Sequence, residues 1–212
     1  MTIPETHFSG VICYPGLPMT EYKLINTAFR SLARLQEMVT EEEQSGWAVQ
    51  GAGPFYLYLM REVNVRRVHR VMPILFHSEE RMLALVEEMA RDGWSLAGLG
   101  PNYAYFSRPP DSTEPVELRF HQRSIDLLTP GGIRKLLNHE GHDGWTARAM
   151  TASSAIFSKP TAGADAVEHL LEATLLHTAS STLRLLEVRR SADWHLACAS
   201  RLFLTFWRVV RD

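Results

Sequence analysis

The chain has little of what marks several large protein classes. Its 212 residues include only two cysteines, Cys13 and Cys198, which excludes a disulfide-stabilised framework. No apolar run approaches the ~20 residues of a membrane-spanning helix. The first residues also lack the basic region and apolar stretch of a secretory signal. These absences predict a cytoplasmic protein that does not bind membranes.

Excess charge is absent as well, and so are the common catalytic motifs. The 22 Lys and Arg residues nearly balance 24 Asp and Glu residues, which argues against a dedicated nucleic-acid-binding protein. No phosphate-binding loop, dinucleotide fingerprint, serine elbow or pair of catalytic carboxylates stands at a recognisable spacing. The sequence therefore predicts no cofactor and identifies no catalytic residue.

What the chain does have is a register repeated four times. Its markers are tryptophans spaced 47, 51 and 49 residues apart: Trp47, Trp94, Trp145 and Trp194. Sixteen residues before each tryptophan stands a hydroxyl residue: Ser31, Ser78, Thr129 and Thr178. Fourteen residues after each stands a long cation: Arg61, Arg108, Lys159 and Arg208. A period of this size indicates one supersecondary unit in four tandem copies.

Each copy reads as strand, helix, strand, strand. The hydroxyl residue suits a helix N-cap, and the apolar residues that follow keep helical spacing. The predicted helices end at Gly46, Gly93, Gly144 and Asp193. Two short strands follow each helix, and a further strand precedes it near residues 21–29, 68–77, 117–127 and 167–177, the last of which reads equally well as a helix. The pattern predicts an α+β fold: pseudo-symmetric antiparallel sheets covered by helices, with the last strand of each copy between the other two.

A copy of about 45 residues is too small to bury a sufficient core alone. We therefore expect the copies to pack on one another as pseudo-symmetric pairs. The proline-rich segment 109–115 is the best divider, giving halves at 21–110 and 111–212. Residues 1–20 stand outside the register and are predicted to form an irregular arm.

Part of the register resembles a known family. The run 85–96, LVEEMARDGWSL, and the closing run 105–109, YFSRP, resemble a small bacterial domain of unknown function. Its members share a helix ending in glycine–tryptophan and a strand pair ending in an aromatic–polar–basic step. Copy three is similar, and copies one and four match more loosely, since Asp193 replaces the glycine in copy four. The resemblance covers residues 21–61, 68–109, 117–160 and 167–208, and it implies a small α+β unit without an assigned activity.

The candidate binding residues come from the same register. If the copies are related by symmetry, the cations Arg61, Arg108, Lys159 and Arg208 converge on an anionic ligand; the alternative is that each caps a strand edge or pairs with a carboxylate. Two tyrosine pairs, in copies one and two only, predict an aromatic sheet surface: Tyr56, Tyr58, Tyr103 and Tyr105. His77 and His177, each directly before its cap residue, are candidate bases in a cleft between copies.

Other chemistry is less well supported. His139-Glu140-Gly141-His142 has i, i+3 spacing instead of the i, i+4 spacing of a helical zinc site, so we predict no metal site. We interpret the tryptophans as structural wedges between the helix end and the sheet; the alternative is that they are stacking platforms for a flat ligand or for unpaired bases. Cys198 takes the place of Gly51, Gly98 and Ala149, which predicts a buried core thiol.

The leading hypothesis is a non-catalytic binding or regulatory scaffold that presents an aromatic, Arg-edged surface to a protein or small anionic ligand. A second hypothesis is nucleic-acid binding through the basic strand ends and tyrosines. A third is an enzyme with its site between copies, using His77 or His177 beside an arginine.

Overall fold

The computed structural model describes residues 7–10, 20–62, 65–174, 177–200 and 202–210, and within them it contains four similar units. Unit 1 comprises β2 (Thr20–Asn26), α1 (Leu32–Gln44), β3 (Ala48–Ala52) and β4 (Tyr56–Glu62). Unit 2 comprises β5 (Val68–Pro73), α2 (Glu79–Arg91), β6 (Ser95–Leu99) and β7 (Tyr103–Arg108). Unit 3 comprises β8 (Leu118–Ser124), α3 (Pro130–His142), β9 (Thr146–Met150) and β10 (Ser154–Pro160). Unit 4 comprises β11 (Val167–Ala173), α4 (Ala179–Ser191), β12 (His195–Ala199) and β13 (Phe203–Val209). The α+β class and the strand–helix–strand–strand order are confirmed.

The helix boundaries follow from the residues predicted to set them. In every unit the hydroxyl residue is the N-cap, and its oxygen accepts a hydrogen bond from the backbone N–H three residues on. At the other end, Gly46, Gly93, Gly144 and Asp193 all have positive φ, between 63° and 83°. The left-handed residue turns the chain directly from helix into strand.

In each sheet the last strand of the unit lies between the other two and is antiparallel to both, as expected. The first sheet has a fourth strand, β1 (His7–Gly10), which pairs with β2. Residues 7–10 are therefore a sheet edge, which corrects the prediction of an irregular arm there. The rest of that arm, residues 1–6 and 11–19, lies outside the described residues.

A β-bulge interrupts the same strand in all four units. The pairing of the third strand with the fourth shifts by one residue at Gln50, Ala97, Arg148 and Ala197. A bulge adds twist and lets neighbouring residues on one strand face the same side. The simple alternation expected from the sequence is therefore broken, and both Gly98 and Leu99 are buried.

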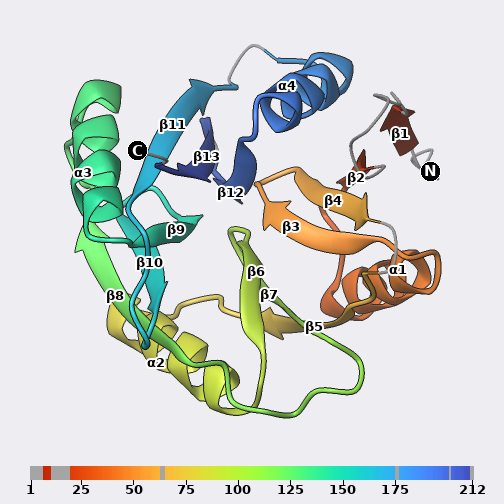
Figure 1. The fold of residues 1–212 in the computed structure, drawn as a ribbon. Coiled ribbons are helices and arrows are strands. Elements are labelled where there is room, and N and C mark those ends of the chain that lie inside the picture. Colours follow the sequence, from red (N-terminus) through yellow and green to blue (C-terminus); the bar gives the residue numbers. More distant parts are fainter. Residues whose placement is uncertain (1–6, 11–19, 63–64, 175–176, 201, 211–212) are drawn as a thin grey trace.

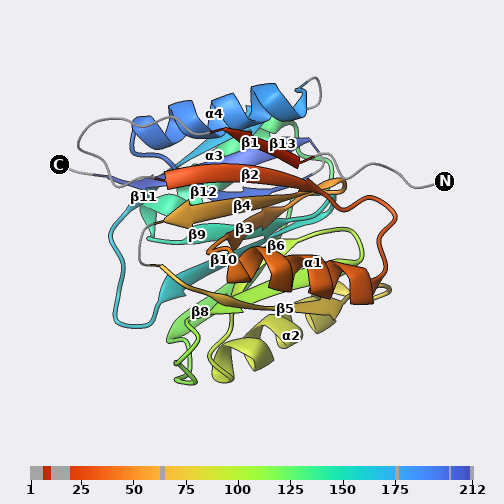
Figure 2. The same ribbon diagram turned by 90° about the vertical axis from the view of Figure 1, so that its right-hand side faces the viewer.

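The units form a closed ring, whereas we expected from the sequence that the copies would pack as pseudo-symmetric pairs. The bulged strands β3, β6, β9 and β12 lie at the centre, each in contact with the next, and β12 contacts β3 again. Figure 1 shows the four helices around the outside, one per unit, and Figure 2 shows the ring from the side. Each helix also contacts the first strand of the following unit: α1 with β5, α2 with β8, α3 with β11 and α4 with β2.

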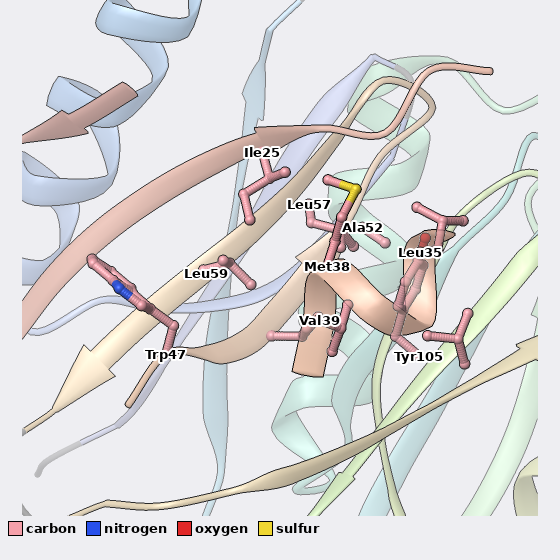
Figure 3. Packing of buried hydrophobic residues seen from close by; sticks show 11 residues of the cluster. Ile25, Leu35, Met38, Val39, Trp47, Ala52, Leu57, Leu59 and Tyr105 are labelled. Carbon is pink, nitrogen blue, oxygen red and sulfur yellow. The ribbon is translucent and has the colours of Figure 1, made fainter. Parts of the chain in front are cut away.

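The hydrophobic cores lie between units. One core joins α1 and the first sheet to Val71 and Tyr105 of unit 2, and Figure 3 shows the Tyr105 side chain among the unit 1 residues near α1. A second joins unit 2 to Ala149 and Ile156 of unit 3. The remaining two join unit 3 to unit 4 and unit 4 back to unit 1. Since every core draws on two units, the fold depends on closure of the ring.

Close packing at the centre explains the small residues there. A Cβ on Gly98 would lie 2.7 Å from the backbone nitrogen of Ala52, so β6 approaches β3 more closely than a larger residue allows. Cys198 at the equivalent position is a free thiol with 2% exposure, and burial raises its pKa to about 12. The prediction of a buried core thiol is confirmed. Cys13 lies outside the described residues.

Candidate anion-binding pocket

Every unit contains a cation stacked on its own tryptophan. The guanidinium carbon lies 4.7 Å from the ring centroid for Arg61 on Trp47, and 4.5 Å for both Arg108 on Trp94 and Arg208 on Trp194. In unit 3 the Lys159 ammonium lies 5.0 Å from the ring of Trp145. The structure therefore distributes the four cations of the register over four separate indole rings, one for each unit.

In units 1 and 4 a glutamate on the first strand neutralises this cation. Glu21 stands opposite Arg61 across the β2–β4 ladder and forms an ion pair with it. Glu168 stands opposite Arg208 and accepts two hydrogen bonds from its guanidinium, at 2.8 and 2.9 Å. The alternative weighed from the sequence, a strand-end cation paired with a carboxylate, describes these two sites.

A second cationic position, 24 residues before the tryptophan, also faces the indole. Lys23 lies 5.7 Å from the ring of Trp47 and is paired with Glu42 of α1 at 2.6 Å. In unit 3 the position is His121, whose ring centroid is 4.0 Å from that of Trp145. Its Nε2 lies 2.9 Å from Glu140, the residue equivalent to Glu42. In unit 4 the position is Leu170, which packs against a core.

Unit 2 keeps both cations and has lost both carboxylates. Val68, not glutamate, stands opposite Arg108 in the β5–β7 ladder. Met89 occupies the helix position held by Glu42 in unit 1 and Glu140 in unit 3. Arg70 and Arg108 thus flank Trp94, at 5.9 and 4.5 Å from its centroid, and no described carboxylate pairs with either. Arg108 Nη1 donates to the carbonyl of Asp92 at 3.3 Å, while its buried Nε has no partner among the described residues.

A pocket of about 620 Å³ opens at this place, between unit 1 and unit 2. Its lining residues come from α1, the α2 end, β5, β7 and the following loop: Gln36, His69, Arg70, Arg91, Asp92, Trp94, Arg108 and Thr113. Three arginines face one aspartate, so the pocket has a positive excess.

His69 lies against this pocket but has no free ring nitrogen. Its Nε2 accepts a hydrogen bond from the backbone N–H of Val49 at 3.0 Å, and its Nδ1 lies 3.3 Å from Glu43 Oε2. Burial and the nearby Arg67 charge lower the pKa of His69 to about 4, so the ring is neutral at pH 7. The residue links β5 to β3. His169 repeats the Nε2 contact in unit 4, where it accepts a hydrogen bond from Ala147 N–H at 3.2 Å.

The other candidate residues from the sequence lie elsewhere. His77 is at the start of α2, and Trp94 follows its end, so the 13-residue helix, about 20 Å long, separates His77 from the pocket. His177 is exposed beside the cap of α4. Tyr58 and Tyr105 are buried in two different cores, which corrects the expectation that they form part of an aromatic surface. Tyr56 and Tyr103 are half-buried at the edges of those cores.

The sequence alone assigned Arg70, Arg91 and His69 to no binding site, although the position 24 residues before the tryptophan carried a signal. It holds Lys23, Arg70 and His121 in three of the four copies. At the end of α3, His139 and His142 are exposed, and Glu140 between them is buried. Glu140 there is 3% exposed and accepts from Arg123 at 2.7 Å.

All four helices in the described parts of the chain have 13 residues, and none qualifies as a candidate membrane span. Comparisons with protein-family models, curated proteins and solved structures found no match. The geometry of the pocket is therefore the basis for assigning a function.

Proposed function

We propose that the protein is a non-catalytic binding or regulatory scaffold that holds a small anionic ligand in the pocket between units 1 and 2. The observation that carries this proposal is the difference between copies. Glu42 of unit 1 and Glu140 of unit 3 lie beside the residue at the second position, and units 1 and 4 neutralise the stacked cation with a glutamate. Unit 2 has neither carboxylate.

The side chains suit a carboxylate or a phosphate group. Arg70 and Arg108 are held over Trp94, so little side-chain entropy remains to be lost when they bind an anion. A guanidinium donates two parallel hydrogen bonds to a planar or tetrahedral oxyanion, and Arg91 adds a third positive charge at the rim. Asp92 offsets part of this charge and leaves the pocket with a positive excess.

The pocket residues favour binding over catalysis. A general base needs a free lone pair within reach of the substrate, and both ring nitrogens of His69 are engaged. Nucleic-acid binding has weaker support, because Tyr58 and Tyr105 are buried and cannot stack on bases. The likeness of each unit to the small bacterial domain of unknown function adds no activity to this proposal.

Isothermal titration with inorganic phosphate, acetate and citrate tests the proposal. We expect one binding site per chain, and an affinity reduced roughly 10- to 100-fold in Arg108→Gln and in Arg70→Gln, the effect of removing a charged hydrogen bond. Arg61→Gln and Arg208→Gln remove the same charge from neutralised sites and serve as matched controls. Equal affinities in Arg108→Gln and Arg61→Gln, or no binding of any of the three anions up to about 10 mM, contradict the proposal.

A further inference from the structure

The end of the ring opposite the tryptophans consists of loops and turns that are hydrogen-bonded to each other. In each unit the loop between first strand and helix donates a backbone hydrogen bond to the turn between the third and fourth strands. The donor and acceptor pairs are Thr27 to Phe55, Ile74 to Asn102, Ile125 to Ser153 and Thr174 to Leu202, at 2.7 to 2.9 Å. Loop and turn therefore form one surface in every unit.

Contacts between units bring these surfaces to the same end. A Cβ on Gly53 would lie 3.7 Å from the carbonyl oxygen of Ser200, and a Cβ on Gly100 would lie 3.7 Å from that of Gly53. Ser153 Oγ of unit 3 donates to Glu79 at the start of α2 at 2.8 Å. Figure 2 shows the segment between β2 and α1 at the right-hand side of the molecule. We call this end the loop face.

Large apolar side chains stand out from the loop face. Phe29, Phe76 and Leu127 are 98%, 94% and 103% exposed, and each is 18 residues before the tryptophan of its unit. The fourth equivalent, Leu176, lies outside the described residues. Five more exposed apolar residues belong to the same loops and turns or to the helix start beside them: Leu32, Phe55, Leu75, Leu128 and Leu202. Fully exposed phenylalanine and leucine side chains gain nothing from the packing of their own chain.

The backbone at these three residues is also costly. Phe29, Phe76 and Leu127 have φ of 59°, 65° and 63°, in the left-handed region that a residue with a Cβ adopts only at a steric cost. Glycine or asparagine would relieve this strain and would remove an apolar side chain from water. Strained, exposed and apolar residues at one repeated position indicate that the side chains are buried against something else.

We infer that the loop face binds the loop face of a second copy of this chain. A ring of protruding side chains leaves a gap between each pair of neighbours. A second ring, turned over about a twofold axis, places its own side chains in those gaps, which is the self-complementarity that an isologous dimer requires. The rim carries both signs of charge, from Arg30, Arg81, Glu79, Glu80 and Asp126, so the turned copy can pair them.

The composition of the loop face favours a second copy over a lipid surface. Interfaces of homodimers are apolar and poor in charge at their centre, and the eight exposed side chains named above are all apolar. Surfaces that bind anionic lipid carry an excess of Lys and Arg on the membrane side, and the mixed rim here gives no such excess.

Sedimentation equilibrium of the full chain tests the inference. We expect a dimer at about 100 μM protein, and at least a tenfold weaker dimer for the double variant Phe29→Ser, Phe76→Ser. The control is Val188→Ser, which replaces a 48% exposed apolar residue on α4, away from the loop face, and should leave the dimer intact.

The outcomes are distinct from those of the anion titration. Both serine substitutions are at exposed residues, so circular dichroism should show an unchanged fold. A wild-type chain that stays monomeric overturns the inference, and so does a dimer that the double variant leaves unchanged. Sedimentation with neutral or anionic vesicles, lost in the same double variant while the chain stays monomeric, would assign the surface to lipid instead.

Discussion

At the residue scale, Asp193 shows what one substitution in the register does. It ends α4 with φ of 63°, where the other three units have glycine. Since glycine adopts this conformation without steric cost, Asp193→Gly should raise the free energy of unfolding by about 0.5–1 kcal/mol. Urea denaturation measures the change. A side chain at the equivalent glycine of unit 2 should have the opposite effect. Gly93→Ala should lower the free energy of unfolding, since the new Cβ would lie 2.8 Å from the carbonyl oxygen of Glu114.

The buried histidines predict a loss of stability in acid. The pKa of His69 and of His169 is lowered by burial from 6.5 to about 4 in the folded chain. Above pH 6.5 both states are neutral and stability is complete. Between pH 6.5 and pH 4 only the unfolded chain takes up the proton, so each histidine costs up to about 3 kcal/mol as the pH falls through this range.

Urea denaturation at pH 7.5 and at pH 5 checks this prediction. His69→Gln keeps an acceptor for the Val49 N–H and removes the titrating ring, so the difference between the two pH values should shrink. His142→Gln, at an exposed side chain, should leave the difference unchanged. An equal pH dependence in wild type and His69→Gln would contradict the assignment.

For the residues of the pocket, some features could be predicted from the sequence and others could not. The stacked cation was predictable because it recurs at a fixed distance from the tryptophan. The charge of the pocket was not, since it depends on which carboxylate faces each cation. Glu21 is 40 residues from Arg61 and meets it only through the pairing of β2 with β4.

At the element scale, the approach of α3 to β11 sets a sharp limit on side-chain size. A Cβ on Gly141 would lie 2.3 Å from the carbonyl oxygen of Val167. Gly141→Ala should therefore lower the free energy of unfolding by roughly 1–3 kcal/mol, the usual cost of overpacking. Gly131→Ala, in the first turn of the same helix, has its nearest atom at 3.9 Å and should stabilise slightly, because alanine favours helix. Thermal unfolding of the two variants compares them directly; equal melting temperatures would count against the close contact.

Helices and strands were largely predictable, because caps and apolar spacing are local signals. The helix at 32–44, for example, begins after its N-cap Ser31 and ends before Gly46. The repeated bulge at Gln50 and its equivalents was not predictable, because a bulge is a property of how two strands pair. The strand at 167–173, which read equally well as a helix, is fixed by its pairing with β13.

At the scale of the whole molecule, the shared cores predict that half a chain does not fold. Residues 1–110 would lose Ala149 and Ile156 from one core and the α4 side of another. We expect 1–110 and 111–212 each to lack a cooperative unfolding transition, and their co-expression to restore it. Circular dichroism during thermal unfolding measures this. A cooperative transition in either half alone would show that the ring is not needed.

Ring closure lay beyond the sequence, because a tandem array can be open or closed with the same local pattern. The contacts that close the ring, such as α4 against β2, join unit 4 to unit 1, the two units farthest apart in the sequence. The division into halves at 109–115 stays a prediction about how the chain is organised.

The contact of α4 with β2 also affects local opening of the folded chain. An open array frays from its outermost repeats, each of which has only one neighbour, and it needs special polar end caps. In this ring each unit shares a core with the unit before it and the unit after it. No unit is then a natural starting point for partial opening, so backbone amides in the four helices should exchange with solvent at comparable rates. We therefore expect the four units to open and unfold as one cooperative unit.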